Sequence, residues 1–153
     1  MINVLVVDDN GPIRKSLRSL LATAEDIKLI AMATNGVEAV EKAHSLSPDV
    51  AVMDISMPLM DGIEATEHIR ECCRLTRVII FSSFKDPEHV RRALEVGAKG
   101  YVLKDEAASD LLEGIRTIHL GKHYFSQKIT EIAEKFLPEI SPNEYNPPLV
   151  ASL

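Results

Sequence analysis

The sequence lacks the features of a membrane or exported protein. No apolar run approaches the roughly 20 residues that a membrane-spanning helix needs. The amino terminus has no charged segment ahead of its first apolar stretch, which a signal peptide would have. We therefore expect a cytoplasmic protein that makes no contact with a membrane.

Cysteine and positive charge are scarce as well. The two cysteines, Cys72 and Cys73, are adjacent, so a disulfide framework is excluded and reduced thiols are expected. His68 lies one helical turn before Cys72, but two ligands do not make a metal site. The formal net charge of −6 argues against direct binding of this chain to a nucleic-acid backbone.

What the chain does have is a strict alternation of apolar strands and amphipathic helices. A length of 153 residues is enough for one real core. Five short, wholly apolar or nearly apolar runs predict buried strands: Ile2–Val7, Lys28–Ala33, Val50–Met53, Val78–Phe81 and Tyr101–Leu103. Helical spacing of apolar residues predicts a helix after each strand, the fifth of them from about Glu106 to Gly121.

This alternation predicts the fold class. Five β-α units with short connections give an α/β fold with a doubly wound parallel sheet, because each crossover must be right-handed. The expected strand order is 2-1-3-4-5, which is the flavodoxin-like arrangement. A short sixth helix is expected from Gln127 to about Phe136, and prolines cluster from Pro138 to Pro148. We therefore predict one domain over residues 1–121, followed by a linker helix and proline-rich tail over residues 122–153.

Polar side chains follow four of the five predicted strands at the point where each strand ends. Asp8 and Asp9 follow the first strand, Asp54 the third, Ser82 the fourth and Lys104 the fifth. Because all strands of a parallel sheet point the same way, these residues should converge at its carboxyl end, where open α/β sheets bind ligands.

The expected cluster suggests metal-assisted phosphoryl chemistry. Two carboxylates about 4 Å apart repel by roughly 4 kcal/mol at an effective dielectric near 20, so the acids must share protons or hold a hard cation, for which Mg²⁺ fits best. Asp54 would be the nucleophile that forms an aspartyl phosphate, while Asp8 and Asp9 would hold the metal. Lys104 would neutralise a phosphoryl oxygen and Ser82 would donate a hydrogen bond to another.

These motifs resemble the receiver domain of two-component response regulators. The resemblance covers roughly residues 1–121 and implies that Asp54 takes phosphate from a sensor histidine kinase. It also implies that Mg²⁺ is bound by Asp9, Asp54 and the backbone carbonyl of Ser56, with Asp8 acting through water. The matching segments are Asp8-Asp9, Asp54 to Pro58 with Asp61-Gly62, Ser82, and Gly100 to Lys104.

The resemblance also implies a conformational switch. Ser82 and Tyr101 would be the switch pair: the hydroxyl of Ser82 moves toward the new phosphate and the Tyr101 ring turns inward. Ser56 and Phe84 occupy positions that tune the lifetime of the phosphate in this family. Such a domain is a signalling device that catalyses its own phosphorylation and dephosphorylation, and not an enzyme with an external product.

Within the family, Lys104-Asp105 in place of the commoner Lys-Pro is similar to the NarL/FixJ (LuxR-type) transcription regulators. A non-proline cis peptide costs about 2.5 to 4 kcal/mol, so the cis bond usual after that lysine is in doubt here. The subfamily binds DNA through a helix-turn-helix domain that this sequence does not contain. We expect the chain to be the receiver half of such a regulator and to form a homodimer on phosphorylation.

Three other functions compete with this interpretation. A haloacid-dehalogenase-like phosphatase would need Asp-x-Asp after the first strand with the first acid as nucleophile, whereas Asp8 and Asp9 are adjacent. A flavodoxin-like electron carrier would need a phosphate-binding loop where these two acids lie. A phosphate-blind interaction module is disfavoured because no expected site residue is missing.

Overall fold

The computed structural model describes residues 1–140 of the 153-residue chain. Its centre is one parallel sheet in the order β2-β1-β3-β4-β5-β6. This order confirms the predicted 2-1-3-4-5 arrangement and adds a sixth strand beside β5. The strands are β1 (Ile2–Val7), β2 (Ile27–Ala33), β3 (Val50–Met53), β4 (Arg77–Ser82), β5 (Gly100–Leu103) and β6 (Tyr124–Phe125).

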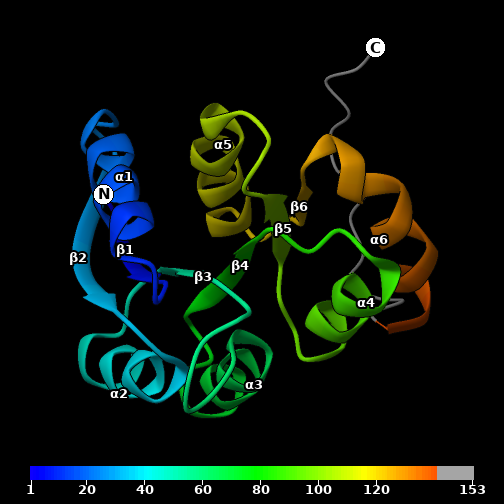
Figure 1. Cartoon of the computed structure of the whole chain (residues 1–153), viewed down its shortest axis with the longest axis horizontal. Coiled ribbons are helices and arrows are strands. Elements are labelled where there is room, and N and C mark those ends of the chain that lie inside the picture. Colours follow the sequence, from blue (N-terminus) through cyan, green and yellow to red (C-terminus); the bar gives the residue numbers. More distant parts are fainter. Residues whose placement is uncertain (141–153) are drawn as a thin grey trace.

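Helices cover both faces of the sheet. In Figure 1, α1 and α5 lie on one face, α2 and α3 lie on the other, and α6 packs beside α4 at the end of the sheet farthest from β2. The helices are α1 (Gly11–Ala22), α2 (Gly36–Leu46), α3 (Gly62–Cys72), α4 (Pro87–Glu95), α5 (Ala108–His119) and α6 (Gln127–Ile140).

Two apolar cores follow from this layering. Successive residues of a buried strand point to opposite faces, so β1 sends Val4 and Val6 to the core under α1 and α5, and Leu5 and Val7 to the core under α2, α3 and α4. β3 lies between β1 and β4, and its four residues are all buried. The strand that Asp54 follows is therefore in the middle of the sheet.

Short polar side chains fix where the first four helices begin. Asn10, Asn35, Asp61 and Asp86 each accept a hydrogen bond from a backbone N–H in the first turn of the helix that follows. The fifth helix was expected from about Glu106 but begins at Ala108, without a side-chain cap. The prediction was two residues early because the Lys104 to Glu106 segment forms a turn closed by the Glu106 N–H on the Leu103 carbonyl at 3.2 Å.

The segment after α5 differs most from the prediction. β6 pairs with β5 through Gly100 with Tyr124 and Tyr101 with Phe125, and α6 buries Ile129, Ala133 and Leu137 in the same core as α4. The helix also runs to Ile140 and includes Pro138, past the predicted end near Phe136. Residues 124–140 are thus packed onto the sheet. The rest of the predicted proline-rich tail, from residue 141, lies outside the described residues.

Two further expectations concern the backbone and the membrane. Every peptide bond within residues 1–140 is trans, so the bond after Lys104 is trans as well. Among the same residues, no helix is both long enough and apolar enough to cross a bilayer.

Candidate functional site

Two buried carboxylates lie side by side at the carboxyl end of the central strands. Asp8 follows β1 and Asp54 follows β3, and their side chains are 1% and 9% exposed. These strands are neighbours, and the Asp54 N–H donates to the Val7 carbonyl at 3.0 Å, so the sheet ladder itself sets the two acids next to each other. Asp9 is exposed at the mouth of the same site.

The three acids form one cluster of oxygen atoms. One carboxylate oxygen from each of Asp8, Asp9 and Asp54 lies within 4.8 Å of the other two. Burial, and then the negative charge of Asp8, raises the pKa of Asp54 to about 6, against the opposing attraction of Lys104. The site therefore holds negative charge in a place where water cannot fully solvate it.

Lys104 is the cation of this site. It follows β5, and its Nζ atom lies 2.8 Å from Asp8 Oδ2 and 3.2 Å from Asp54 Oδ1, with 16% of the side chain exposed. Asp8 Oδ2 is fully buried and accepts no hydrogen bond of good geometry within residues 1–140, so the ion pair with Lys104 is its main compensation. One ammonium group thus serves two carboxylates.

Backbone donors hold the carboxylates in place. Asp8 Oδ1 accepts the Asn10 N–H and Asp54 Oδ1 accepts the Ile55 N–H, both at 2.9 Å. In addition, Arg14 Nη1 donates to the Asp8 carbonyl at 2.8 Å. Sequence reasoning missed Arg14, because its role depends on α1 turning this side chain back over the end of β1.

Gly62 lets the loop after β3 return close to Asp54. A Cβ atom at this position would lie 1.7 Å from the Asp54 carbonyl oxygen, and the Gly62 N–H donates to the Ile55 carbonyl at 2.8 Å. Any side chain would push the loop away from the site. The sequence carried a signal for this, since Asp61-Gly62 is part of the receiver-like motif.

Ser82 and Tyr101 are joined through the backbone of Phe84. The Ser82 hydroxyl accepts the Phe84 N–H at 3.0 Å, and the Tyr101 hydroxyl donates to the Phe84 carbonyl at 2.6 Å. Tyr101 is fully buried, which raises its pKa, so the ring expected to turn inward on phosphorylation already lies inside in this structure. The structure places Ser82 beside Lys104, whose N–H donates to the Ser82 carbonyl at 2.9 Å. No hydrogen bond between the Ser82 hydroxyl and the carboxylates is found in residues 1–140.

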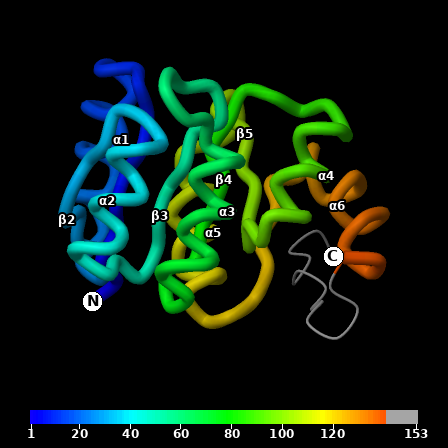
Figure 2. Tube along the Cα trace, turned by 90° about the horizontal axis from the view of Figure 1, so that it is seen from below, coloured from blue at the N-terminus to red at the C-terminus, as the bar shows by residue number. Residues whose placement is uncertain are grey.

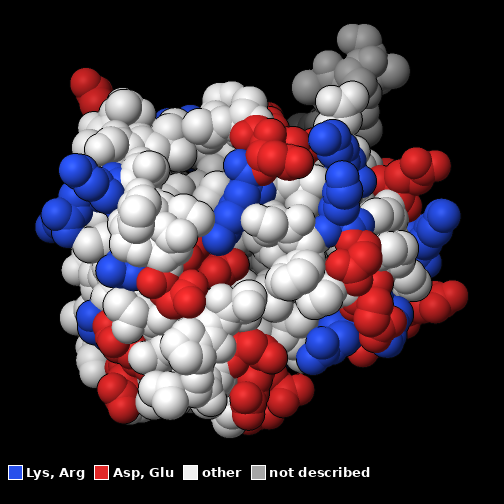
Figure 3. Space-filling model, in the orientation of Figure 1, with Lys and Arg blue, Asp and Glu red and all other residues white. Residues whose placement is uncertain are grey.

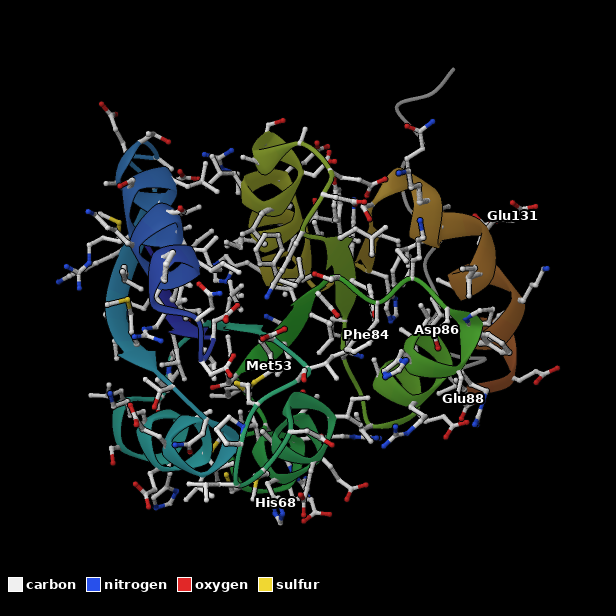
Figure 4. The ribbon with its side chains drawn as sticks, in the orientation of Figure 1. Met53, His68, Phe84, Asp86, Glu88 and Glu131 are labelled. Atoms are coloured by element: carbon white, nitrogen blue, oxygen red, sulfur yellow. The ribbon has the colours of Figure 1, made fainter. Side chains whose placement is uncertain are left out.

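In the loop after β4, Phe84 and Asp86 both contact His89 of α4. Figure 4 shows Phe84 and Asp86 close together where this loop leads into α4. The Phe84 ring stacks on His89 with centroids 4.0 Å apart, and His89 Nδ1 lies 2.8 Å from the Asp86 carboxylate. Ser56, two residues after Asp54, is exposed in the loop after β3.

The donor set fits a hard divalent cation. Carboxylate oxygens are the ligands that Mg²⁺ prefers, and the cluster combines two buried acids with one exposed acid at the entrance. The site also sets carboxylate oxygens beside an ammonium group, the kinds of groups that phosphoryl transfer uses. Acidic and basic side chains are interspersed over the face seen in Figure 3, which offers no continuous basic groove for nucleic acid.

Comparisons with known proteins agree with this chemistry. The sequence profile described as "Response regulator receiver domain" matches residues 4–116. The transcriptional regulatory protein LnrK of Bacillus subtilis (strain 168) is 39% identical over 130 residues, which are 85% of this chain and 59% of LnrK. The response regulator protein VraR of Staphylococcus epidermidis (strain RP62A) is 38% identical over 128 residues, 84% of this chain and 61% of VraR. The chain thus spans about 60% of the length of these relatives.

Solved structures give the same result. A two-component response regulator of the LuxR family from Aurantimonas sp. SI85-9A1 superposes with a TM-score of 0.84 at 30% identity, covering 88% of this chain and 96% of that chain. The response regulator domain of Thermotoga maritima CheB superposes with a TM-score of 0.74 at 38% identity, covering 78% of this chain and 97% of that chain.

Proposed function

The chain belongs to the response regulator receiver domain family, and from that premise we propose that it accepts a phosphoryl group on Asp54 from a sensor histidine kinase. The observation that carries the proposal is the pairing of two buried carboxylates, Asp8 and Asp54, with the single ammonium group of Lys104. A charged cluster of this kind costs stability, because burial disfavours its ionised form.

Mg²⁺ is the cofactor we propose. The carboxylates of Asp8, Asp9 and Asp54 supply the hard oxygen ligands, and the family resemblance adds the backbone carbonyl of Ser56. When bound, the ion would offset the negative charge of the acids and of the incoming phosphoryl group. Its positive charge would oppose both causes of the raised pKa of Asp54, which are burial first and then the negative charge of Asp8.

The transfer itself uses the groups already at the site. A carboxylate oxygen of Asp54 attacks the phosphorus of the kinase phosphohistidine, a P–O bond forms, and the P–N bond breaks as the imidazole leaves. Lys104 shifts its ammonium group to an oxygen of the phosphoryl group. The domain supplies these groups itself, so a small phosphoryl donor should suffice in place of the kinase.

The switch follows from the new charge. An aspartyl phosphate brings strong acceptor oxygens to the site, and we propose that the Ser82 hydroxyl leaves the Phe84 N–H to donate to one of them. The loop after β4 would then move, because Phe84 links Ser82 to Tyr101. The phosphate can shift this equilibrium only by the difference between its contacts in the two packings.

The wider protein is proposed to be a transcription regulator. LnrK is called a transcriptional regulatory protein, and the chain matches about 60% of its length. We propose that residues 1–121 are the receiver, that the chain after them, of which residues 124–140 pack onto the receiver sheet, connects to a DNA-binding domain, and that phosphorylation drives homodimerisation.

Intact mass spectrometry tests the central claim. The protein is incubated with acetyl phosphate and Mg²⁺, beside the variants Asp54→Asn, Asp8→Asn and Asp105→Asn. We expect one added phosphoryl group that is stable in acid and labile in base, lost in Asp54→Asn and retained in the control Asp105→Asn, which changes an exposed acid near the same site.

Two outcomes would contradict the proposal. Modification that persists in Asp54→Asn would move the phosphoacceptor elsewhere. Loss of the covalent adduct in Asp8→Asn, with Asp54→Asn still modified, would instead indicate the nucleophile of a haloacid-dehalogenase-like phosphatase.

A further inference from the structure

Three metal-binding side chains meet at the amino end of the sheet, far from the acidic site in the topology. His44 lies in the last turn of α2, Cys72 is the last residue of α3, and Cys73 caps that helix. One ligand atom of each lies within 4.8 Å of the other two. Both cysteines are free thiols, so their sulfur atoms are available.

We propose that His44, Cys72 and Cys73 form a binding site for Zn²⁺ or a similar thiophilic metal ion. Thiolate and imidazole are the ligands that such ions select, whereas Mg²⁺ prefers oxygen. Three protein ligands leave one position of a tetrahedral zinc ion open to water or to a small exogenous ligand. Binding would release the two thiol protons to the buffer.

The two helix ends that carry these ligands are held together by the fold. Figure 2 shows α2 and α3 side by side on the same face of the sheet. Beyond them, the buried Thr76 hydroxyl donates to the Pro48 carbonyl at 2.7 Å, which ties the loop after α3 to the loop after α2. The Thr76 N–H also donates to the Cys73 carbonyl at 3.0 Å. These contacts hold the two helix ends that carry the ligands next to each other.

An ion could reach all three ligands from solvent. His44 and Cys72 are exposed and Cys73 is half-buried. Within the part of the chain that the structure describes, the His44 imidazole has no hydrogen bond or ion pair that would hold it away from the thiols. His68, which precedes Cys72 by one helical turn, is also exposed but is not part of the cluster.

Cobalt binding tests the site in the full chain. The reduced, chelator-treated protein is titrated with Co²⁺ in the presence of excess Mg²⁺, and Zn²⁺ is then added to displace the cobalt. We expect one ion per chain and a thiolate-to-cobalt charge-transfer band in the near ultraviolet. Cys72→Ser and Cys73→Ser should each weaken the band and lower the affinity for Zn²⁺ by roughly 100-fold or more, since the loss of a residue that merely orients a ligand already costs 10- to 100-fold in affinity.

Matched controls separate this site from others. His44→Asn should weaken binding at least roughly tenfold, while His68→Asn, the exposed histidine on α3, should bind as the wild type does. Asp105→Asn, which changes an exposed acid outside both ligand clusters, should also leave the charge-transfer band unchanged. Thermal unfolding of each apo variant checks that it is folded.

Several results would overturn the proposal. These are a charge-transfer band of unchanged intensity in Cys72→Ser, an equal loss of Co²⁺ affinity in His68→Asn and His44→Asn, or native mass spectra with one ion shared between two chains. A second measurement needs no variant: Zn²⁺, but not Mg²⁺, should slow alkylation of both thiols by iodoacetamide. Alkylation at an unchanged rate would also refute the site.

Discussion

The two ends of the sheet are built on opposite principles. At the carboxyl end, Asp8 and Asp54 are buried acids that share one lysine. At the amino end, two hydrogen bonds join the loops to each other and to β1: the Asp49 carboxylate accepts the Asn3 N–H at 2.8 Å and Thr76 donates to Pro48 at 2.7 Å. The same sheet thus carries two buried carboxylates with one cation at its carboxyl end and these hydrogen bonds at its amino end.

This difference indicates that the carboxyl end of the sheet, with its buried charges, lowers the stability of the fold. A buried hydrogen bond between neutral groups stabilises by about 1 kcal/mol, whereas a buried carboxylate near a second one disfavours the folded state unless a cation compensates it. If this comparison is correct, mutations at the two ends should lower the free energy of unfolding by different amounts. Only those at the carboxyl end should depend on pH and Mg²⁺.

The largest effect is expected from Lys104→Met, which removes the cation shared by Asp8 and Asp54. Loss of one partner from a buried ion pair costs about 3 to 5 kcal/mol. We expect the free energy of unfolding, measured by urea denaturation near neutral pH without Mg²⁺, to fall by about 4 kcal/mol. Lys85→Met, at an exposed lysine after β4, should change it by less than about 0.5 kcal/mol. If both variants lost the same free energy of unfolding, Lys104 would have no special role in compensating the buried acids.

The next effect is a dependence of stability on pH. Burial and Asp8 raise the pKa of Asp54 to about 6 in the folded protein, above the value of about 3.9 expected in the unfolded chain. Folded protein then binds more protons than unfolded chain between about pH 4 and pH 6, so this acid's contribution to stability is lost as the pH rises through that window. For a shift of about 2 pKa units the loss is about 3 kcal/mol.

Urea denaturation in Mg²⁺-free buffer across this window measures the effect. Asp54→Asn should lack this part of the pH dependence and gain in stability relative to the wild type as the pH rises. Asp105→Asn should keep the wild-type profile. A constant difference between wild type and Asp54→Asn at all pH values would show that this carboxyl does not titrate as described.

The smallest effect belongs to the amino end. Thr76→Val removes the hydroxyl that pairs with the Pro48 carbonyl and leaves a buried acceptor unsatisfied, which costs about 1 to 3 kcal/mol. We expect a loss of about 1.5 kcal/mol that does not change with Mg²⁺. Thr23→Val is the matched control, because Thr23 makes a similar bond to Leu20 at the surface. Identical unfolding curves for the two variants would argue against a tie between the loops.

Most of the fold could be predicted because its signals are long and mutually consistent. Apolar runs at β1, β3, β4 and β5, separated by amphipathic helices, allow few topologies other than a doubly wound sheet. β6 was missed because a two-residue strand has no measurable periodicity. It forms because the chain after α5 returns beside β5, where the Tyr124 N–H donates to the Lys99 carbonyl at 3.1 Å.

The candidate site also has parts that the sequence predicts and parts that it does not. Topology alone brings Asp8, Asp54 and Lys104 together, since each follows a strand of one parallel sheet. The link through Phe84 could not be predicted, because it depends on the path of the loop after β4. His44 was also out of reach, since only the packing of α2 against α3 brings it to the thiols.

The two edge strands of the sheet, β2 and β6, differ in length. β6 has two residues, so it offers an incoming chain almost no ladder to extend, whereas β2 has seven. A free strand of that length can recruit another molecule into a continuous sheet. The exposed Lys28 and the irregular register between β1 and β2 near Val4 interrupt such a template. At the β6 edge, the short length of the strand therefore protects against aggregation by strand addition. At the β2 edge, the charge of Lys28 and the irregular register do so.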